Sequence, residues 1–150
     1  MGERWRPDGP TDYRLSMKIS DVVRGKGDGV VTIRPDDTVE HLLSVLAEHR
    51  IGALVVSDDG ASVSGIVSER DVVRHLQSSG AAVLGGPVSA IMTSEVTTCG
   101  PDDDVAGLAQ TMTDRRIRHV PVLVDGQLVA IVSIGDIVKN RIAVLENERA

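Results

Sequence analysis

Two short stretches of the sequence pair a serine with an aspartate three residues later. Ser68 and Asp71 lie in GIVSERDVV, and Ser133 and Asp136 lie in AIVSIGDIV. At the start of a helix such a pair is a capping box, in which the hydroxyl and the carboxylate bond the first free amides. The same groups suit a ribose, because a carboxylate can accept hydrogen bonds from both vicinal hydroxyls. The pattern therefore leaves two interpretations open, a helix cap and a ligand site.

The two stretches belong to a longer internal repeat. Val31–Val56 aligns with Val96–Val122 when one extra residue is allowed in the second copy, which superimposes their Pro-Asp-Asp motifs. Repeats of this length indicate two similar structural units. We expect a flexible tail at 1–16, a first repeat at 17–79, a linker at 80–87, a second repeat at 88–146 and a C-terminal tail at 147–150.

Each copy predicts the element order β-α-β-β-α after a short opening helix, which we expect at 17–23 and 88–92. A brief strand is expected at 30–33 and 95–98. Apolar residues at i, i+3, i+4 and i+7 then predict an amphipathic helix in each copy: Val39, Leu42, Leu43 and Leu46, and Val105, Leu108, Ala109 and Met112. Asp37, and Asp103 or Asp104, are predicted to cap these helices.

Two β-branched runs separated by an Asp-Gly turn follow in each copy, and a last helix is predicted to start after Ser68 and after Ser133. One copy alone buries too little apolar surface for a comfortable margin of stability. We therefore expect an α/β (α+β) fold in which the two copies pack about a pseudo-two-fold axis and form two clefts.

The composition limits the classes of function that the chain can have. Sixteen basic and twenty-two acidic residues give a net charge of -6, so the chain has no bulk attraction for nucleic acid or anionic membranes. No apolar run reaches the ~18 residues that a membrane span needs, and the N-terminal sequence is not a secretory signal. The single cysteine, Cys99, allows no internal disulfide and is expected to be buried and inert. These features favour a cytoplasmic location.

Enzymatic chemistry finds little support in the residues. The sequence has no CxxC, no HExxH and no phosphate-binding P-loop, and its carboxylates are scattered over caps and turns. We therefore expect no catalytic residues, no metal ligands and no enzymatic activity.

From residue 17 to about residue 141, the chain resembles a stand-alone pair of CBS domains. Val88–Thr93 resembles the family's opening motif, Ile117–Val122 resembles its strand ending in Pro-Val, and Gly65–Asp71 resembles its G-h-h-S/T-x-x-D ending. The resemblance implies a regulatory module that binds AMP, ADP, ATP, NAD or S-adenosylmethionine, requires no cofactor, forms a homodimer and acts on an unknown regulated protein. Some members bind nothing, so a ligand-free dimerisation or scaffold protein is the alternative.

The resemblance also implies which residues hold the ligand. The ribose is expected to bind Ser68 and Asp71 in one cleft and Ser133 and Asp136 in the other, and the ligand is expected to come close to the backbone at Gly65. The residues expected to bind phosphate are Arg70, Arg118 and His119. The residues expected to contact adenine are Val31, Ile33, Ile51 and Ile66 in one cleft, and Val96, Thr98, Ile117 and Ile131 in the other. The aliphatic residues would equally suit a core, and lone arginines are commonly solvated surface charges.

The two copies differ within these motifs. Copy one has Gly65 and Arg70 where copy two has Ala130 and Gly135. An arginine can donate to phosphate in bidentate fashion, and a glycine lets a ligand come close to the backbone. We therefore expect copy one to be the stronger ribose site.

Overall fold

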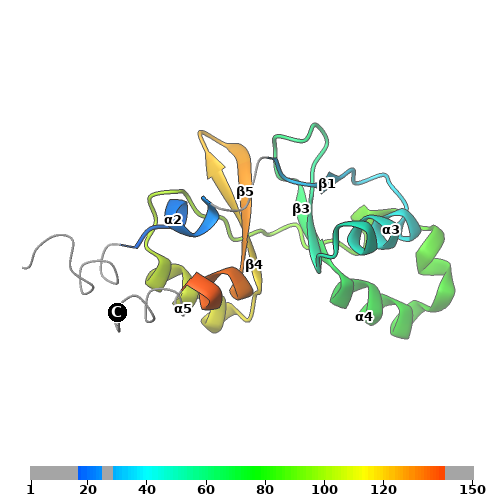
Figure 1. Cartoon of the computed structure of the whole chain (residues 1–150). Helices are drawn as coiled ribbons and strands as arrows, with labels where there is room; N and C mark the ends of the chain where they lie inside the picture. Colours follow the sequence, from blue (N-terminus) through cyan, green and yellow to red (C-terminus); the bar gives the residue numbers. More distant parts are fainter. Residues whose placement is uncertain (1–16, 25–28, 141–150) are drawn as a thin grey trace, which may run out of the picture. The chain divides into compact units, whose positions relative to one another are not determined.

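The computed structural model describes residues 17–24 and 29–140 (Figure 1). The expected tails at 1–16 and 147–150 lie outside the described residues. The chain divides into two compact units, each with its own buried core. Unit 1 comprises Met1–Asp28, Thr98–Leu123 and Ala130–Ala150, and unit 2 comprises Gly29–Thr97 and Val124–Val129. Neither unit coincides with one sequence repeat.

Unit 2 is a small sheet covered by helices. Its elements are β1 (Thr32–Ile33), α3 (Val39–His49), β2 (Ala53–Val56), β3 (Gly65–Ser68), α4 (Glu69–Ser79) and the 3-10 helices η1 (Gly80–Gly85) and η2 (Val88–Ala90). The strand order is β1-β2-β3, with β1 parallel to β2 and β3 antiparallel to it. Val39, Leu42 and Leu46 are buried in the core, which confirms the amphipathic helix. The segment expected as a linker contains η1, which packs on α3 and α4.

Unit 1 has the same order of elements, but its first strand is reduced to a single bridge at Cys99. Its elements are α2 (Ile19–Val23), α5 (Val105–Arg115), β4 (His119–Val124), β5 (Gln127–Ser133) and a helix that occupies residues 134–140 of the described chain. Strands β4 and β5 pair through a two-residue turn in which Asp125 and Gly126 both have positive φ, 52° and 78°, as a tight hairpin requires. The strand predicted at 95–98 was wrong, because pairing begins only at Cys99, which bridges Val122 in parallel.

The opening helices are exchanged between the repeats. The amide of Ile19, from the first repeat, donates to the carbonyl of Asp103 in the second (3.0 Å), and the amide of Val88, from the second, donates to the carbonyl of Asp37 in the first (2.8 Å). Ile19 and Val88 are both fully buried, in the cores of unit 1 and unit 2 respectively. Each core is therefore completed by a helix that the other repeat supplies.

The caps of the amphipathic helices differ from the prediction in one copy. Asp104 caps α5, since its carboxylate accepts from the amide of Gly107 (2.9 Å). Asp37 does not cap α3; the hydroxyl of Thr38 accepts from the amide of His41 there (3.1 Å). The carboxylate of Asp37 instead accepts from a backbone amide three residues back and closes the preceding turn.

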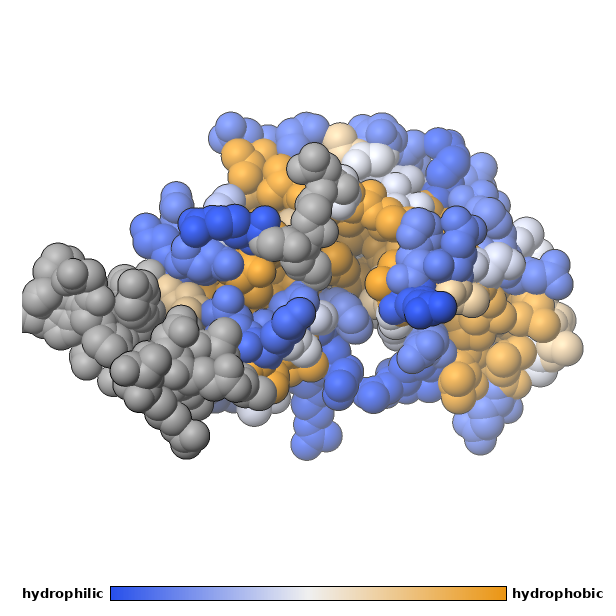
Figure 2. Space-filling model, in the orientation of Figure 1, coloured by the Kyte–Doolittle hydropathy of each residue, from blue (hydrophilic) through white to orange (hydrophobic). Residues whose placement is uncertain are grey.

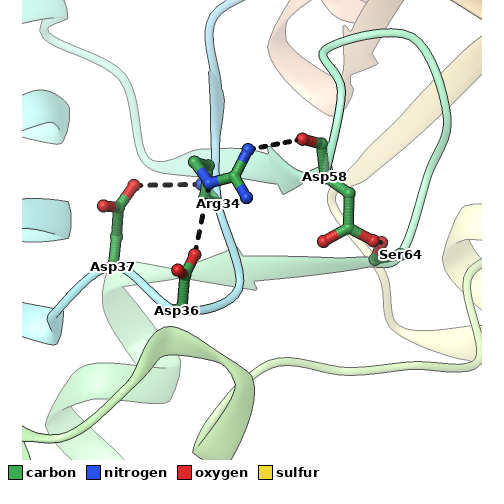
Figure 3. Close-up of polar contacts among 5 residues, drawn as sticks. All are labelled: Arg34, Asp36, Asp37, Asp58 and Ser64. Carbon is green, nitrogen blue, oxygen red and sulfur yellow. Dashed lines mark hydrogen bonds and ion pairs between the residues drawn. The ribbon is translucent and has the colours of Figure 1, made fainter.

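That turn is tied to the β2–β3 loop by Arg34 (Figure 3). Its Nη1 donates to the carbonyl of Asp58 (2.6 Å) and its Nε to the carboxylate of Asp36 (3.3 Å). The amide of Arg34 donates to Asp37 (3.1 Å), while the hydroxyl of Ser64 donates to the carboxylate of Asp58 (3.4 Å). The loop between two buried strands is thus anchored to the end of β1.

Inside the loop, Asp59 is a hydrogen-bond acceptor for its own turn. Its Oδ1 accepts from the amides of Ser62 (2.8 Å) and Ala61 (2.9 Å) and from the hydroxyl of Ser57 (3.2 Å). The amides of Ser62 and Ala61 stabilise the ionised form and hold the pKa of Asp59 well below its usual range. The loop is therefore ordered by its own polar groups.

Candidate functional site

The first serine–aspartate pair stands at the start of α4, where it forms a capping box. The amide of Asp71 donates to Oγ of Ser68 (3.2 Å), and Oδ2 of Asp71 accepts from the amide (2.8 Å) and the hydroxyl (3.1 Å) of Ser68. Among the described residues, nothing donates to the other carboxylate oxygen, Oδ1. Ser68 and Asp71 are half-buried, so this oxygen is available to a ligand while the cap stays intact.

The second pair has the same geometry in unit 1. The amide of Ser133 donates to Oδ2 of Asp136 (2.9 Å), and the amide of Asp136 donates to Oγ of Ser133 (3.1 Å). Both residues are half-buried, as in unit 2. The capping interpretation is therefore confirmed at both positions, and the duplicated sequence builds a duplicated structure.

A backbone hydrogen bond joins each capping box to the strand entry beside it. The amide of Glu69 donates to the carbonyl of Gly52 (3.0 Å), and the amide of Ile134 donates to the carbonyl of Arg118 (2.9 Å). Arg118 therefore starts from the backbone next to the Ser133–Asp136 box, at the position that Gly52 occupies in unit 2. In unit 2 the nearby arginine is Arg70, the second residue of α4. Arg70 and Arg118 are both exposed.

Gly65 has a packing role that the sequence did not reveal. It is buried, and a Cβ there would lie 2.8 Å from the carbonyl oxygen of Thr93 and 2.8 Å from Sδ of Met92. Its neighbour Ile66 exchanges two backbone hydrogen bonds with Thr93 (3.0 and 2.8 Å). The missing side chain thus lets the segment after η2 pair with β3. Its predicted contact with a ligand stays a prediction.

The aliphatic candidates of unit 2 divide between core and surface. Ile33 is buried and Val31 packs against the same core. Ile66 is half-buried in β3, and Ile51, which follows α3, is 38% exposed. Ile51 and the half-buried Val31 and Ile66 could offer an edge to a ring, whereas Ile33 is only 3% exposed.

The candidates of the second copy are placed differently. Ile117 packs against the core of unit 1, and Ile131 and His119 are half-buried in the hairpin. Val96 belongs to unit 2 and Thr98 is an exposed residue of unit 1.

The structural counterparts of Val31 and Ile33 are residues that the sequence analysis missed. Cys99 pairs with Val122 as Ile33 pairs with Val56, so the counterpart of Ile33 is Cys99 and that of Val31 is Thr97. Counting back from the Pro-Asp-Asp motif of each copy gives this register, whereas alignment of the valines at 31 and 96 does not.

Comparison with known proteins agrees with this duplicated geometry. The family model "CBS domain" matches residues 19–78 and again residues 88–143. The chain belongs to the CBS-domain family. A crystal structure of the CBS-domain containing protein ATU1752 from Agrobacterium tumefaciens is 42% identical, with a TM-score of 0.80, and the match covers 83% of this chain and 99% of that one. The fold is therefore that of a CBS-domain pair.

Two curated relatives support the same assignment. CBSX3 of Arabidopsis thaliana, described as mitochondrial, is 39% identical over 132 residues, which cover 83% of this chain and 64% of that protein. YhcV of Bacillus subtilis is 29% identical over 121 residues, which cover 81% and 83%. The CBS pair thus spans somewhat under two thirds of the plant protein and most of the bacterial one.

One further structure of this fold contains a nucleotide. The structure of CBSX2 in complex with AMP matches 85% of this chain and 97% of its own, with a TM-score of 0.69 and 22% identity. At this identity the match shows a common fold.

The described part of this CBS pair lacks a metal-binding cluster and a membrane-spanning helix. Residues 17–24 and 29–140 contain no group of three His, Cys, Asp or Glu side chains that could hold a metal ion. Within the same residues, no helix is both long and apolar enough to cross a membrane. Cys99 is buried, as expected, and burial together with the nearby carboxylate of Asp103 raises the pKa of its thiol to about 11. The thiol is therefore protonated at neutral pH and a poor nucleophile.

Proposed function

We propose that this CBS pair is a regulatory module, without enzymatic activity, that binds an adenosine-containing ligand such as AMP, ADP or ATP. The observation that carries the proposal is the Ser68–Asp71 box, in which the cap occupies only one carboxylate oxygen of Asp71. A ribose presents two vicinal hydroxyls to such a carboxylate, and hydrogen bonds to a charged group contribute about 1.5 to 3 kcal/mol. Cap and ribose site are therefore compatible in the same two residues.

Basic residues near the two boxes support a ligand that carries a phosphate. Arg70 and Arg118 are exposed. Arg70 lies in α4 between Ser68 and Asp71, and the carbonyl of Arg118, before β4, accepts from the amide of Ile134 beside Ser133. Guanidinium groups bind phosphate with paired hydrogen bonds. His119, the first residue of β4, is the third candidate.

The ligand class is further supported by proteins of the same fold. CBSX2 was solved with AMP, and the CBS pair of MJ0100 was solved with 5′-methylthioadenosine and S-adenosyl-L-methionine. These ligands share an adenosine group and differ in what is attached to it. We propose that adenosine is the common element recognised here and that the predicted clefts between the repeats receive it.

Thermal unfolding with AMP, ATP, NAD and S-adenosylmethionine tests the proposal. At a hundred times its Kd, a ligand adds about 2.7 kcal/mol to the free energy of unfolding, and we expect AMP or ATP to raise Tm by several degrees. If only NAD or S-adenosylmethionine raises Tm, the ligand is that adenosine compound and not AMP, ADP or ATP. No shift with any of the four would favour the ligand-free scaffold.

We also propose that the module is a homodimer built through its last helices. Val73 of α4 is 64% exposed and Val138, its counterpart in the helix of residues 134–140, is 51% exposed. In Figure 2, hydrophobic residues reach the surface in the part of unit 2 that holds α4 and η1. Light scattering should give twice the chain mass of 15.9 kDa at micromolar concentration, and Val73→Asp should lower it. A monomer mass for the unmodified chain would refute the dimer.

A further inference from the structure

Two Asp-Gly dipeptides of the chain lie wholly within the described residues, Asp59-Gly60 and Asp125-Gly126. Asp8-Gly9 and Asp28-Gly29 include residues outside that part of the chain. An Asp-Gly bond can rearrange without an enzyme, because the amide nitrogen of glycine, which carries no side chain to shield it, can attack the carboxyl carbon of the aspartate. The rate depends on what holds the amide and the carboxyl group, and the two described sites differ in both.

At Asp59-Gly60 both reacting groups are engaged. The amide of Gly60 donates to Oγ of Ser57 (2.8 Å). Oδ1 of Asp59 accepts from the amides of Ser62 (2.8 Å) and Ala61 (2.9 Å). These two amides hold the pKa of the carboxyl group well below its usual range, and an ionised carboxylate is a poor electrophile. The turn must therefore open before Gly60 can attack.

At Asp125-Gly126 neither group is engaged. Both residues are exposed at the tip of the β4–β5 hairpin, and a Cβ at Gly126 would meet nothing within 4 Å. Among the residues that the structure describes, none accepts from the amide of Gly126 and none donates to the carboxylate of Asp125. Asp125 also has φ of 52°, a left-handed conformation that few residues other than glycine adopt. The fold therefore leaves this dipeptide unprotected.

We propose that Asp125-Gly126 is a site of spontaneous backbone isomerisation, at which aspartate is converted to isoaspartate. The amide nitrogen of Gly126 forms a bond to Cγ of Asp125, the carboxyl hydroxyl and the amide proton leave as one water molecule, and a five-membered succinimide ring results. One water molecule then opens the ring. Opening at the α-carbonyl leaves the main chain running through Cβ and Cγ, which is isoaspartate, and opening at the other carbonyl restores aspartate.

Isoaspartate at this position should alter unit 2. The main chain gains one methylene group in a two-residue turn whose length fixes the register of the strands. In β5, the amide of Leu128 donates to the carbonyl of Ala61 (2.7 Å), in the loop that Asp59 orders. Leu128 and Ala61 both belong to unit 2. The modified fraction should therefore exchange the amide of Leu128 faster. This inference does not depend on the proposed adenosine function.

Incubation of the full chain at neutral pH and physiological temperature, followed by trypsin digestion, tests the inference. Trypsin releases residues 51–70 and 119–139 as separate peptides, and electron-based fragmentation distinguishes isoaspartate from aspartate of the same mass. In the folded protein, isoaspartate should form at Asp125 at least about tenfold faster than at Asp59, since opening one hydrogen bond to a charged group already costs a factor of roughly ten. In water enriched in heavy oxygen, each product should gain one heavy oxygen atom.

Denatured protein and two variants are the controls. In denaturant the two sites should react at similar rates, because the dipeptide is the same. Ser57→Ala frees the amide of Gly60 and should raise the rate at Asp59 but not at Asp125. Asp125→Gly keeps two residues suited to positive φ and should abolish isoaspartate in residues 119–139 with Tm unchanged. If Ser57→Ala unfolds, the comparison of folded with denatured unmodified protein decides alone.

Three results would count against the inference. Equal rates at Asp59 and Asp125 in the folded protein, or a faster rate at Asp59, would show that the fold does not select the site. Absence of isoaspartate at Asp125 under conditions in which the denatured protein converts would overturn the site itself. Isoaspartate at Asp125 with unchanged hydrogen exchange at Leu128 would keep the site and overturn its effect on unit 2.

Discussion

The amide of Asp71 donates to the hydroxyl of Ser68 (3.2 Å) while the amide of Ser68 donates to the carboxylate of Asp71 (2.8 Å). This reciprocal pair satisfies two amides that the first turn of α4 would otherwise leave unpaired. It also fixes the carboxylate at the helix start before any ligand arrives. A preorganised acceptor binds with a smaller entropic cost than a mobile one, so the cap supports a binding role for Asp71.

Asp71→Asn should separate the two roles of this carboxylate. The amide oxygen of asparagine can still accept from the amide of Ser68, so the cap and Tm should be largely kept. A ribose would lose a charged acceptor, which costs about 1.5 to 3 kcal/mol, or roughly ten- to a hundredfold in Kd. Titration calorimetry with AMP measures the change.

Asp136→Asn is the matched variant in unit 1. Copy one keeps the fuller motif, with Gly65 and Arg70, so the loss of affinity should be smaller for Asp136→Asn than for Asp71→Asn. If Asp71→Asn binds AMP as tightly as the unmodified protein with the fold intact, Asp71 is a helix cap only.

Gly65→Ala should destabilise unit 2. The new Cβ would lie 2.8 Å from the carbonyl oxygen of Thr93, and relieving such a contact in a packed core costs about 1 to 3 kcal/mol. Chemical denaturation should show the loss. Gly107→Ala, on an exposed position of α5 where the nearest atom is 3.6 Å away, is the control and should gain about 0.5 to 1 kcal/mol. An unchanged midpoint for Gly65→Ala would contradict the packing role.

Local patterns predicted the elements and the duplicated box. The apolar spacing from Val39 to Leu46 located α3, and Ser68 located the start of α4, since each signal depends on neighbours within one helical turn. Asp37 failed as a cap because Thr38, one residue on, has a hydroxyl equally able to accept, and the sequence gives no reason to prefer one of two adjacent capping residues.

Long-range contacts were beyond the same signals. The docking of Ile19 beside Asp103 joins residues far apart in the sequence through backbone groups, which every residue possesses. The correspondence of Thr97 and Cys99 to Val31 and Ile33 was missed because a single inserted residue can be placed on either side of a strand without changing its apolar pattern. The pairing of Cys99 with Val122 shows the register that counting back from the two Pro-Asp-Asp motifs also gives.

Ile19→Ala should test the exchange of opening helices. Ile19 is fully buried in the core of unit 1, and truncation of such a residue costs about 2 to 5 kcal/mol. Because Ile19 contacts the second repeat, hydrogen exchange should accelerate first in α5 and less in α3. Val88→Ala, its counterpart in the core of unit 2, should produce the opposite order. Faster exchange in α3 than in α5 for Ile19→Ala would contradict the exchanged arrangement.

The thiol of Cys99 should be inert in the folded protein and should influence stability only in alkali. Its pKa is raised from 9.0 to about 11 by burial and by Asp103, so the folded state favours the neutral thiol. That contribution is complete below pH 9 and is lost as pH rises from 9 to 11. A disulfide reagent at pH 8 should label unfolded chains and spare native ones, and Cys99→Ala should flatten the alkaline loss of stability. Rapid labelling of native protein would contradict the burial.

Arg118→Gly should change which adenosine compound is preferred. The substitution gives unit 1 the residue that unit 2 has at Gly52, so the local backbone has a precedent in the same chain. Loss of one guanidinium should erode the preference for AMP over adenosine, while adenosine binding stays within about twofold.

In the unmodified protein the preference for AMP should also weaken with salt, because partly exposed charges are screened. Calorimetry with both ligands on both proteins, at low and high salt, decides the question. Equal binding of adenosine and AMP by the unmodified protein would show that Arg118 holds no phosphate, and the site would then suit a ligand such as S-adenosylmethionine.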